Sequence, residues 1–304
     1  MRPAALAALA LVLAGCGASV AAPPQSKPGW QFAASMSQRR SYSAAAEVAG
    51  RIYVAGGMVG NTGRFLALTQ RFDPARNTWT TLEPLPFPVR AASAAALGPR
   101  VYVTGGQTAA GITRRVEVYD VRSGHWSAGP PLPAARFNHS TVALGGAVYV
   151  LGGFDGSRER REVFAWHPGE RAWRRVAPLP RPVHAFGAVA FHGELLAIGG
   201  RRGQRILREV WIYDPRTDRW RKGPTLPKPM ELLGAAAAGD RIYAVWEHTY
   251  QVYDRRTGRW REGPSPRVPR HALATFAIGG RLYAVGGCVT PQLVDSQVVE
   301  RLRL

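Results

Sequence analysis

A pair of adjacent glycines recurs along this chain, and a tryptophan recurs in step with it. Five glycine pairs keep this spacing: Gly56-Gly57, Gly105-Gly106, Gly152-Gly153, Gly199-Gly200 and Gly286-Gly287. The tryptophans in step with these pairs are Trp30, Trp79, Trp126, Trp173, Trp220 and Trp260, at spacings of 49, 47, 47, 47 and 40 residues. A period of 40 to 50 residues indicates one supersecondary unit that is repeated and stacked, because a single unit cannot bury its apolar surface alone.

Each repeat contains short runs that are typical of β-strands. Small apolar residues come first, as in residues 91–97, and a run rich in β-branched and aromatic residues then leads into the glycine pair, as in residues 101–104. A polar loop, an aromatic residue with a polar neighbour such as Tyr119-Asp120, and the tryptophan follow. Runs of this length and composition, bounded by Gly, Pro and Asp, predict four antiparallel strands per repeat.

This order of glycine pair, aromatic–aspartate pair and tryptophan resembles the kelch family over residues 29–304. The resemblance implies an all-β fold, a six-bladed kelch-type β-propeller with four antiparallel strands per blade. Trp30 has no glycine pair before it, and the last strand, near residues 298–302, has no tryptophan after it. We therefore expect the N-terminal strand to join the last blade and close the ring.

The first 28 residues have the composition of a targeting segment. Arg2 precedes an apolar stretch at residues 4–14 that is too short for a membrane span, which predicts a signal peptide over residues 1–15. Leu13-Ala14-Gly15-Cys16 resembles the lipobox of bacterial lipoproteins, so Cys16 is the predicted lipidation site. Residues 16–28 are then expected to form a flexible lipid-anchored tether. The expected location is the bacterial cell envelope, on the periplasmic or outer-membrane face; cleavage after Ala21 would instead give a soluble secreted protein.

Composition narrows the classes of partner and cofactor. The net charge of +20 indicates either a surface that attracts anions or a genomic bias toward arginine codons, since the arginines occur in every repeat. Export argues against nucleic acid. If Cys16 carries lipid, Cys288 is the one remaining thiol, so neither a disulfide nor a cysteine-based metal site is expected. No phosphate-binding glycine loop is present, and we expect no cofactor and no metal.

A polar residue follows each tryptophan after 10 or 11 positions, just before the first strand of the next repeat. These residues are Arg40, Arg90, Arg136, His184, Glu231 and Arg270. Alignment on the glycine pairs replaces three of them by the next residue, Ser41, Phe137 and His271. In a meander, the start of the first strand and the end of the second lie at the same edge, so the set should surround one mouth of the ring. Four arginines there would suit carboxylates or phosphates, unless arginine at this position bonds the turns between blades.

The fifth repeat departs from the pattern. Val245-Trp246 replaces the glycine pair and the following loop is short. We expect Glu231, Trp246, Glu247 and His248 to lie together at the mouth, where an aromatic ring with carboxylates and an imidazole could hold a sugar. The alternative is a decayed repeat with a tight hairpin.

Three functions compete. The first is a binding scaffold that holds a protein or an acidic glycan at the mouth face, with membrane contact through the lipid anchor only. The second is an enzyme, a carbohydrate isomerase resembling N-acetylneuraminate mutarotase, in which Glu231 with His184 or His271 would move protons and Arg90 or Arg270 would hold a sugar carboxylate. The third is a copper oxidase like galactose oxidase, for which His139, His184, His271 and Cys288 lack an evident ligand pattern.

Overall fold

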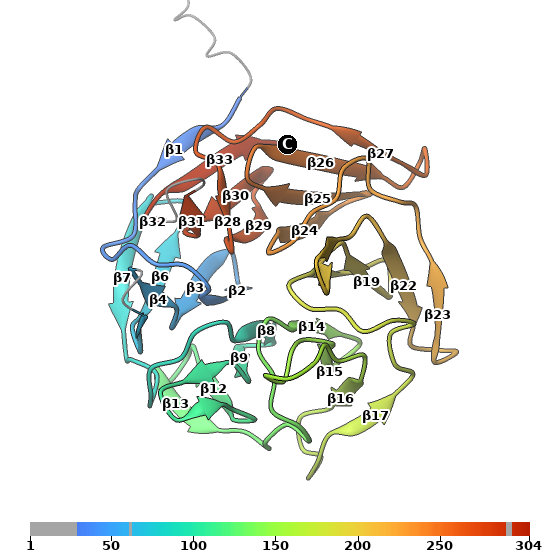
Figure 1. Cartoon of the computed structure of the whole chain (residues 1–304). Coiled ribbons are helices and arrows are strands. Elements are labelled where there is room, and N and C mark those ends of the chain that lie inside the picture. The colour runs from blue at the N-terminus through green and yellow to red at the C-terminus, as the bar shows by residue number, and fades with distance from the viewer. Residues whose placement is uncertain (1–28, 61–62, 290–293) are drawn as a thin grey trace, which may run out of the picture.

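The computed structural model describes residues 29–60, 63–289 and 294–304. Within these residues the regular structure is entirely β, with no helix, and the expected all-β class is confirmed. Six four-stranded antiparallel sheets stand around a common centre (Figure 1). The predicted signal peptide, Cys16 and the tether lie outside the described residues. In the part of the chain that is described, no helix is long and apolar enough to cross a membrane.

The sheets follow one another in chain order and are numbered here from 1 to 6. Sheet 1 contains β2 (Ala44–Val48), β3 (Arg51–Ala55), β6 (Thr69–Asp73) and β7 (Thr78–Leu82), and sheet 2 contains β8 (Ser93–Leu97), β9 (Arg100–Thr104), β12 (Val116–Asp120) and β13 (His125–Ala128). Sheet 3 contains β14 (Ser140–Leu144), β15 (Ala147–Leu151), β16 (Val163–Trp166) and β17 (Arg174–Val176), and sheet 4 contains β18 (Gly187–Phe191), β19 (Glu194–Ile198), β22 (Val210–Asp214) and β23 (Arg219–Lys222). Sheet 5 contains β24 (Gly234–Ala238), β25 (Arg241–Trp246), β26 (Thr249–Asp254) and β27 (Arg259–Glu262). Sheet 6 contains β29 (Ala274–Ile278), β30 (Arg281–Val285), β33 (Val299–Arg303) and β1 (Gln31–Ala33).

Smaller strands follow the second strand of most sheets. They are the hairpins β4 (Met58–Val59) with β5 (Arg64–Phe65), β10 (Gln107–Thr108) with β11 (Gly111–Ile112), and β20 (Arg201–Arg202) with β21 (Arg205–Ile206), and the sheet of β28 (Arg270–His271), β31 (Cys288–Val289) and β32 (Val294–Asp295). These strands lie next to the residues that precede each first strand and build one face of the molecule.

Small residues let the six first strands crowd together. Strand β8 reads SAAAL and β24 reads GAAAA, and each first strand contacts the first strands of both neighbouring sheets, β29 with β2 included. At Gly234 an added Cβ would overlap the hydroxyl of Thr275 on the next sheet. Bulkier first strands would therefore force the sheets apart.

The glycine pairs hold adjacent sheets together. Gly105 and Gly106 have φ of +56° and +100°, and a Cβ on Gly106 would come within 2.5 Å of the Val89 side chain and 2.9 Å of the Arg90 carbonyl oxygen. The Gly106 amide donates to the carbonyl of Arg136, just before the next sheet, at 2.8 Å. Only a residue without a side chain permits both the left-handed backbone and this close approach.

The periodic tryptophans join each sheet to the one before it. In every repeat the indole Nε1 donates to a backbone carbonyl just after the outermost strand of the preceding sheet. The six bonds are Trp79 to Ala34, Trp126 to Glu83, Trp173 to Pro130, Trp220 to Ala177, Trp260 to Pro224 and Trp30 to Pro264, at 2.7–3.0 Å. Trp30 and Trp173 are buried and the other four are half-buried, and each joins two sheets, so the tryptophans are structural.

The two ends of the described chain meet in sheet 6. Strand β1 pairs with β33 in the register Gln31–Arg301, Phe32–Glu300 and Ala33–Val299. In Figure 1 the blue N-terminal strand lies along the red C-terminal one. Sheet 6 therefore contains strands from both ends of the described chain.

Candidate functional site

The residues that precede the first strands pair with the residues that follow the glycine pairs, at one face of the ring that we call the mouth face. The backbone bridges are Ser41–Met58, Arg90–Gln107, Phe137–Phe154, His184–Arg201 and His271–Cys288. They decide the register that alignment on tryptophan and alignment on glycine left open. The structural equivalents of Arg90, His184 and Glu231 are Ser41, Phe137 and His271.

The next residue in every repeat has a left-handed backbone. These residues are Tyr42, Ala91, Asn138, Ala185, Leu232 and Ala272, with φ between 45° and 56°. The backbone amide of each donates to the carbonyl of the equivalent residue in the preceding sheet, at 2.6–3.4 Å, and Tyr42 donates to Ala272. Six amides and six carbonyls thus form a continuous circle, which offsets the strain of positive φ in residues other than glycine.

Three of the four expected mouth arginines are not at the mouth, and the prediction of a four-arginine ring is wrong. Arg40, Arg136 and Arg270 are at most 1% exposed. Their Nη1 atoms donate to the carbonyl of the first glycine of their own sheet and to a second carbonyl before the third strand; the acceptors are Gly56 and Leu68, Gly152 and Glu162, and Gly286 and Val298. These three arginines are therefore structural, as the alternative held, but they bond carbonyls of their own sheet and not the turns between sheets.

The third strand supplies a different partner to each buried guanidinium. Nη2 of Arg40 donates to the Gln70 amide oxygen at 2.8 Å, and Nη2 of Arg270 pairs with Glu300 at 2.7 Å, where both side chains are fully buried. The guanidinium of Arg136 lies over a Phe164 ring at 4.8 Å. Burial lowers the pKa of Arg40 to about 9 and that of Arg136 to about 10, so both stay protonated at neutral pH.

We call five half-buried, ionisable side chains at the mouth the mouth cluster: Tyr42, Arg90, His184, Glu231 and His271. Nε and Nη2 of Arg90 donate to the Gln107 amide oxygen at 3.0 and 2.8 Å. Both carboxylate oxygens of Glu231 accept from Arg201 of the preceding sheet, at 2.6 and 2.8 Å. The charge of Glu231 is thus matched by a guanidinium, in the two-bond geometry that suits arginine.

The two histidines of the mouth cluster have similar surroundings. Burial lowers the pKa of His184 and of His271, while nearby carboxylates, Glu159 at 3.8 Å and Glu247 at 3.7 Å respectively, act in the opposite direction. Glu231 occupies the ring position between those of His184 and His271, and its charge raises the pKa of both histidines.

Tyr42 is a mouth residue that the sequence reasoning missed. Burial raises the pKa of its phenol; Cys288 and Glu231 add to this rise, and Arg90 opposes it. Its ring lies 6.5 Å from that of His271. Alignment on the glycine pairs could have found it, since Tyr42 directly follows the ring position in that register.

The fifth repeat only partly matches its prediction. Glu247, with φ of +49°, donates its amide to the Arg270 carbonyl at 2.8 Å and lies beside His271, so it borders the mouth cluster. The Trp246 side chain packs against the apolar cluster between sheets 4 and 5, and His248 is exposed at the turn. The aromatic platform expected from Trp246 is wrong because its indole packs against this core.

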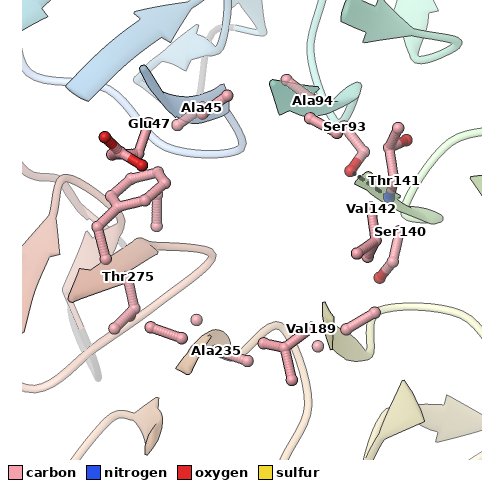
Figure 2. A pocket seen from close by; sticks show the side chains of 18 of the residues that line it. Ala45, Glu47, Ser93, Ala94, Ser140, Thr141, Val142, Val189, Ala235 and Thr275 are labelled. Carbon is pink, nitrogen blue, oxygen red and sulfur yellow. Dashed lines mark hydrogen bonds between the residues drawn. The ribbon is translucent and has the colours of Figure 1, made fainter. Parts of the chain in front are cut away.

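The centre of the ring holds a cavity of about 440 Å³ (Figure 2). The first strands line it with small and hydroxylated side chains, among them Ser93, Ser140, Thr141 and Thr275. Figure 2 shows these side chains around open space, with Glu47 on the opposite wall from Thr141. Among the described residues, no group of three or more His, Cys, Asp and Glu side chains could hold a metal ion.

His139 lines this cavity and gives the fold a pH dependence. Burial and the charge of Arg136 lower its pKa to about 3, while Nε2 is hydrogen-bonded to the Thr104 hydroxyl at 2.8 Å. Between pH 6.5 and about 3 the unfolded chain carries one more proton on this residue, so stability falls as pH falls, by roughly 1 kcal/mol per pH unit. We expect the difference in unfolding free energy between wild type and His139→Gln to shrink over this range. Curves of thermal midpoint against pH that run parallel would contradict the assignment.

Two comparisons with known proteins bear on the family. Residues 43–245 match the family model of the KLHDC2/KLHL20/DRC7 Kelch-repeats domain. The chain is also 34% identical over 97 residues to the F-box/kelch-repeat protein At1g67480 of Arabidopsis thaliana, which is 31% of this chain and 26% of that protein. The chain thus covers about a quarter of that relative. With two thirds of its length matching the domain, and a fold built from the same repeated sheet, this chain belongs to the kelch-repeat family.

Proposed function

We propose that this chain is a six-bladed propeller, closed by its N-terminal strand, that binds an acidic segment of a partner protein at the mouth face. Family membership suggests a protein-binding scaffold, since kelch domains present loops on a rigid frame. The six sheets support six blades. The β1–β33 pairing, the circle of tryptophan bonds and the circle of left-handed residues support closure.

The proposal of an acidic partner rests on an imbalance of charge at the mouth. Among the described residues no carboxylate pairs with Arg90, whereas Glu231 is neutralised by Arg201. Arg90 therefore has an unmatched positive charge, half-buried, where a carboxylate would gain more than at an exposed site. Each histidine that takes up a proton adds to this potential, and the net charge of +20 favours encounter with anions.

Arg90→Ala is expected to weaken the binding of an acidic peptide about tenfold, because a hydrogen-bonded ion pair between the guanidinium and the peptide is lost. The probe is a fluorescein-labelled octamer of alternating glutamate and serine, measured by anisotropy at two salt concentrations. Arg219→Ala, an exposed arginine on outer strand β23, is the control and should leave the affinity unchanged. Equal affinities for wild type and Arg90→Ala would remove this face as the site, and tighter binding of a sulfated glycan would point to a carbohydrate partner.

The ring position of Glu231, between those of His184 and His271, also permits a second function, a carbohydrate isomerase. The variant Glu231→Gln distinguishes the scaffold from the isomerase. For the scaffold, the neutral side chain leaves Arg201 free and should strengthen binding of the same octamer. For the isomerase, the change should abolish interconversion of sugar anomers, followed by NMR on N-acetylneuraminate.

We further propose that the chain is exported and tethered through Cys16. This rests on the N-terminal sequence, which lies outside the described residues. The expected mature N-terminus is a lipid-modified Cys16, detectable by mass spectrometry. An unmodified N-terminus at Ala22 would contradict the tether.

A further inference from the structure

A second cavity, of about 620 Å³, opens on the mouth face between sheets 1 and 2. The hairpin β4–β5 contributes Phe65, the hairpin β10–β11 contributes Ile112, and the chain between the two sheets contributes Phe87 and Pro88. Most of the lining is apolar, and its volume lies within the range of sites that hold a small ligand. None of the five mouth-cluster residues lines this cavity.

Two arginines border the apolar lining. The guanidinium of Arg115, an exposed residue, lies 4.6 Å from the centre of the Phe87 ring, and that of Arg90 lies 5.1 Å from the centre of the Phe65 ring. Among the described residues that line the cavity, none is Asp or Glu. The site therefore combines an apolar wall with positive charges at its edge, held in place by cation–π contacts.

The cavity lies next to the mouth cluster. Arg90 belongs to that cluster, and its guanidinium contacts the ring of Phe65, which lines the cavity. A segment that places a carboxylate at Arg90 can reach the apolar wall with a neighbouring side chain.

We propose that this cavity binds an aromatic or branched aliphatic side chain of the partner's acidic segment, with a flanking carboxylate at Arg90 or Arg115. The proposal rests on the function proposed above and defines the chemistry of the partner further: an apolar anchor flanked by acidic residues. Charge complementarity favours this occupant over an uncharged apolar segment, which would leave both arginines facing buried apolar surface. Anchors of this kind carry most of the energy at protein interfaces.

The test uses two labelled peptides that differ at one position, Gly-Ser-Glu-Glu-Phe-Glu-Glu-Ser-Gly and the same peptide with alanine in place of phenylalanine. We expect the phenylalanine peptide to bind wild type at least tenfold more tightly, because burial of a phenyl ring is worth at least that factor. Ile112→Ser should remove most of this preference and leave the affinity for the alanine peptide unchanged.

Ile206→Ser is the matched control. Ile206 occupies the same place in hairpin β20–β21, where it pairs with Arg201 as Ile112 pairs with Gln107. It should leave the preference intact. If both peptides bind wild type equally, or Ile206→Ser acts as Ile112→Ser does, this cavity is not the subsite while the acidic scaffold stands. If neither peptide binds, both proposals fail.

Discussion

Replacement of Arg270 by alanine is expected to destabilise the folded chain by about 3–5 kcal/mol. The guanidinium makes three bonds inside sheet 6, to the carbonyls of Gly286 and Val298 and to Glu300, each at 2.7 Å. Glu300 also accepts the amide of Arg267, so it stays fixed in the interior. Removal of the arginine leaves a buried carboxylate without its counter-charge and two carbonyls without a donor, which costs far more than the loss of a surface pair.

The midpoint and slope of guanidinium chloride unfolding measure this loss. Arg90→Ala is the control, since Arg90 is half-buried at the mouth and should shift the midpoint little. The double variant Arg270→Met with Glu300→Leu should recover much of the stability, because a buried ion pair can often be replaced by apolar residues of similar size. An Arg270→Ala midpoint close to that of Arg90→Ala would show that the buried hydrogen bonds of Arg270 do not stabilise sheet 6.

Trp30→Ala is the second change with a large expected effect, about 3–5 kcal/mol. The side chain is 4% exposed, its ring lies edge-on to Tyr250 at 5.7 Å, and its Nε1 donates to the Pro264 carbonyl. It therefore links the N-terminal strand to sheet 5, in addition to the pairing of β1 with β33. The change removes this packing and leaves a cavity where sheets 5 and 6 meet.

Phe32→Ala is the matched control, because Phe32 lies on the same strand but is 51% exposed. Its ring contacts Arg267 at the surface, so its loss should cost under about 1 kcal/mol. Thermal unfolding of both variants measures the difference. Similar losses for the two would mean that the N-terminal strand is held by its edge pairing alone and not by the tryptophan.

The register at the mouth shows where prediction from the sequence ended. The spacing after Trp30 and Trp126 pointed to Arg40 and Arg136, whereas the glycine pairs pointed to Ser41 and Phe137. A shift of one residue decides whether a guanidinium faces the mouth or the interior. Several acceptors that hold the buried arginines lie in or just before the third strand, some 26 to 30 residues further along the chain, so local spacing could not reveal them.

The contacts within the mouth cluster were also beyond local spacing, because they join residues of different sheets. Glu231 was predicted at this face, but its partner Arg201 is on the preceding sheet, and Tyr42 enters the cluster because a left-handed backbone turns the chain there. The apolar cavity arises where two hairpins from different repeats come side by side. No pattern within one repeat predicts contacts between two repeats.

The sequence by itself determined the repeat, the all-β class and the structural role of the glycine pairs and tryptophans, because each depends on local chemistry: small residues for crowded strands, glycine for positive φ, and an indole with one donor. The tertiary structure alone decided which arginines are buried, which charges meet at the mouth and where an apolar wall forms. Those outcomes depend on the distance between side chains of neighbouring sheets, which packing sets and periodicity does not.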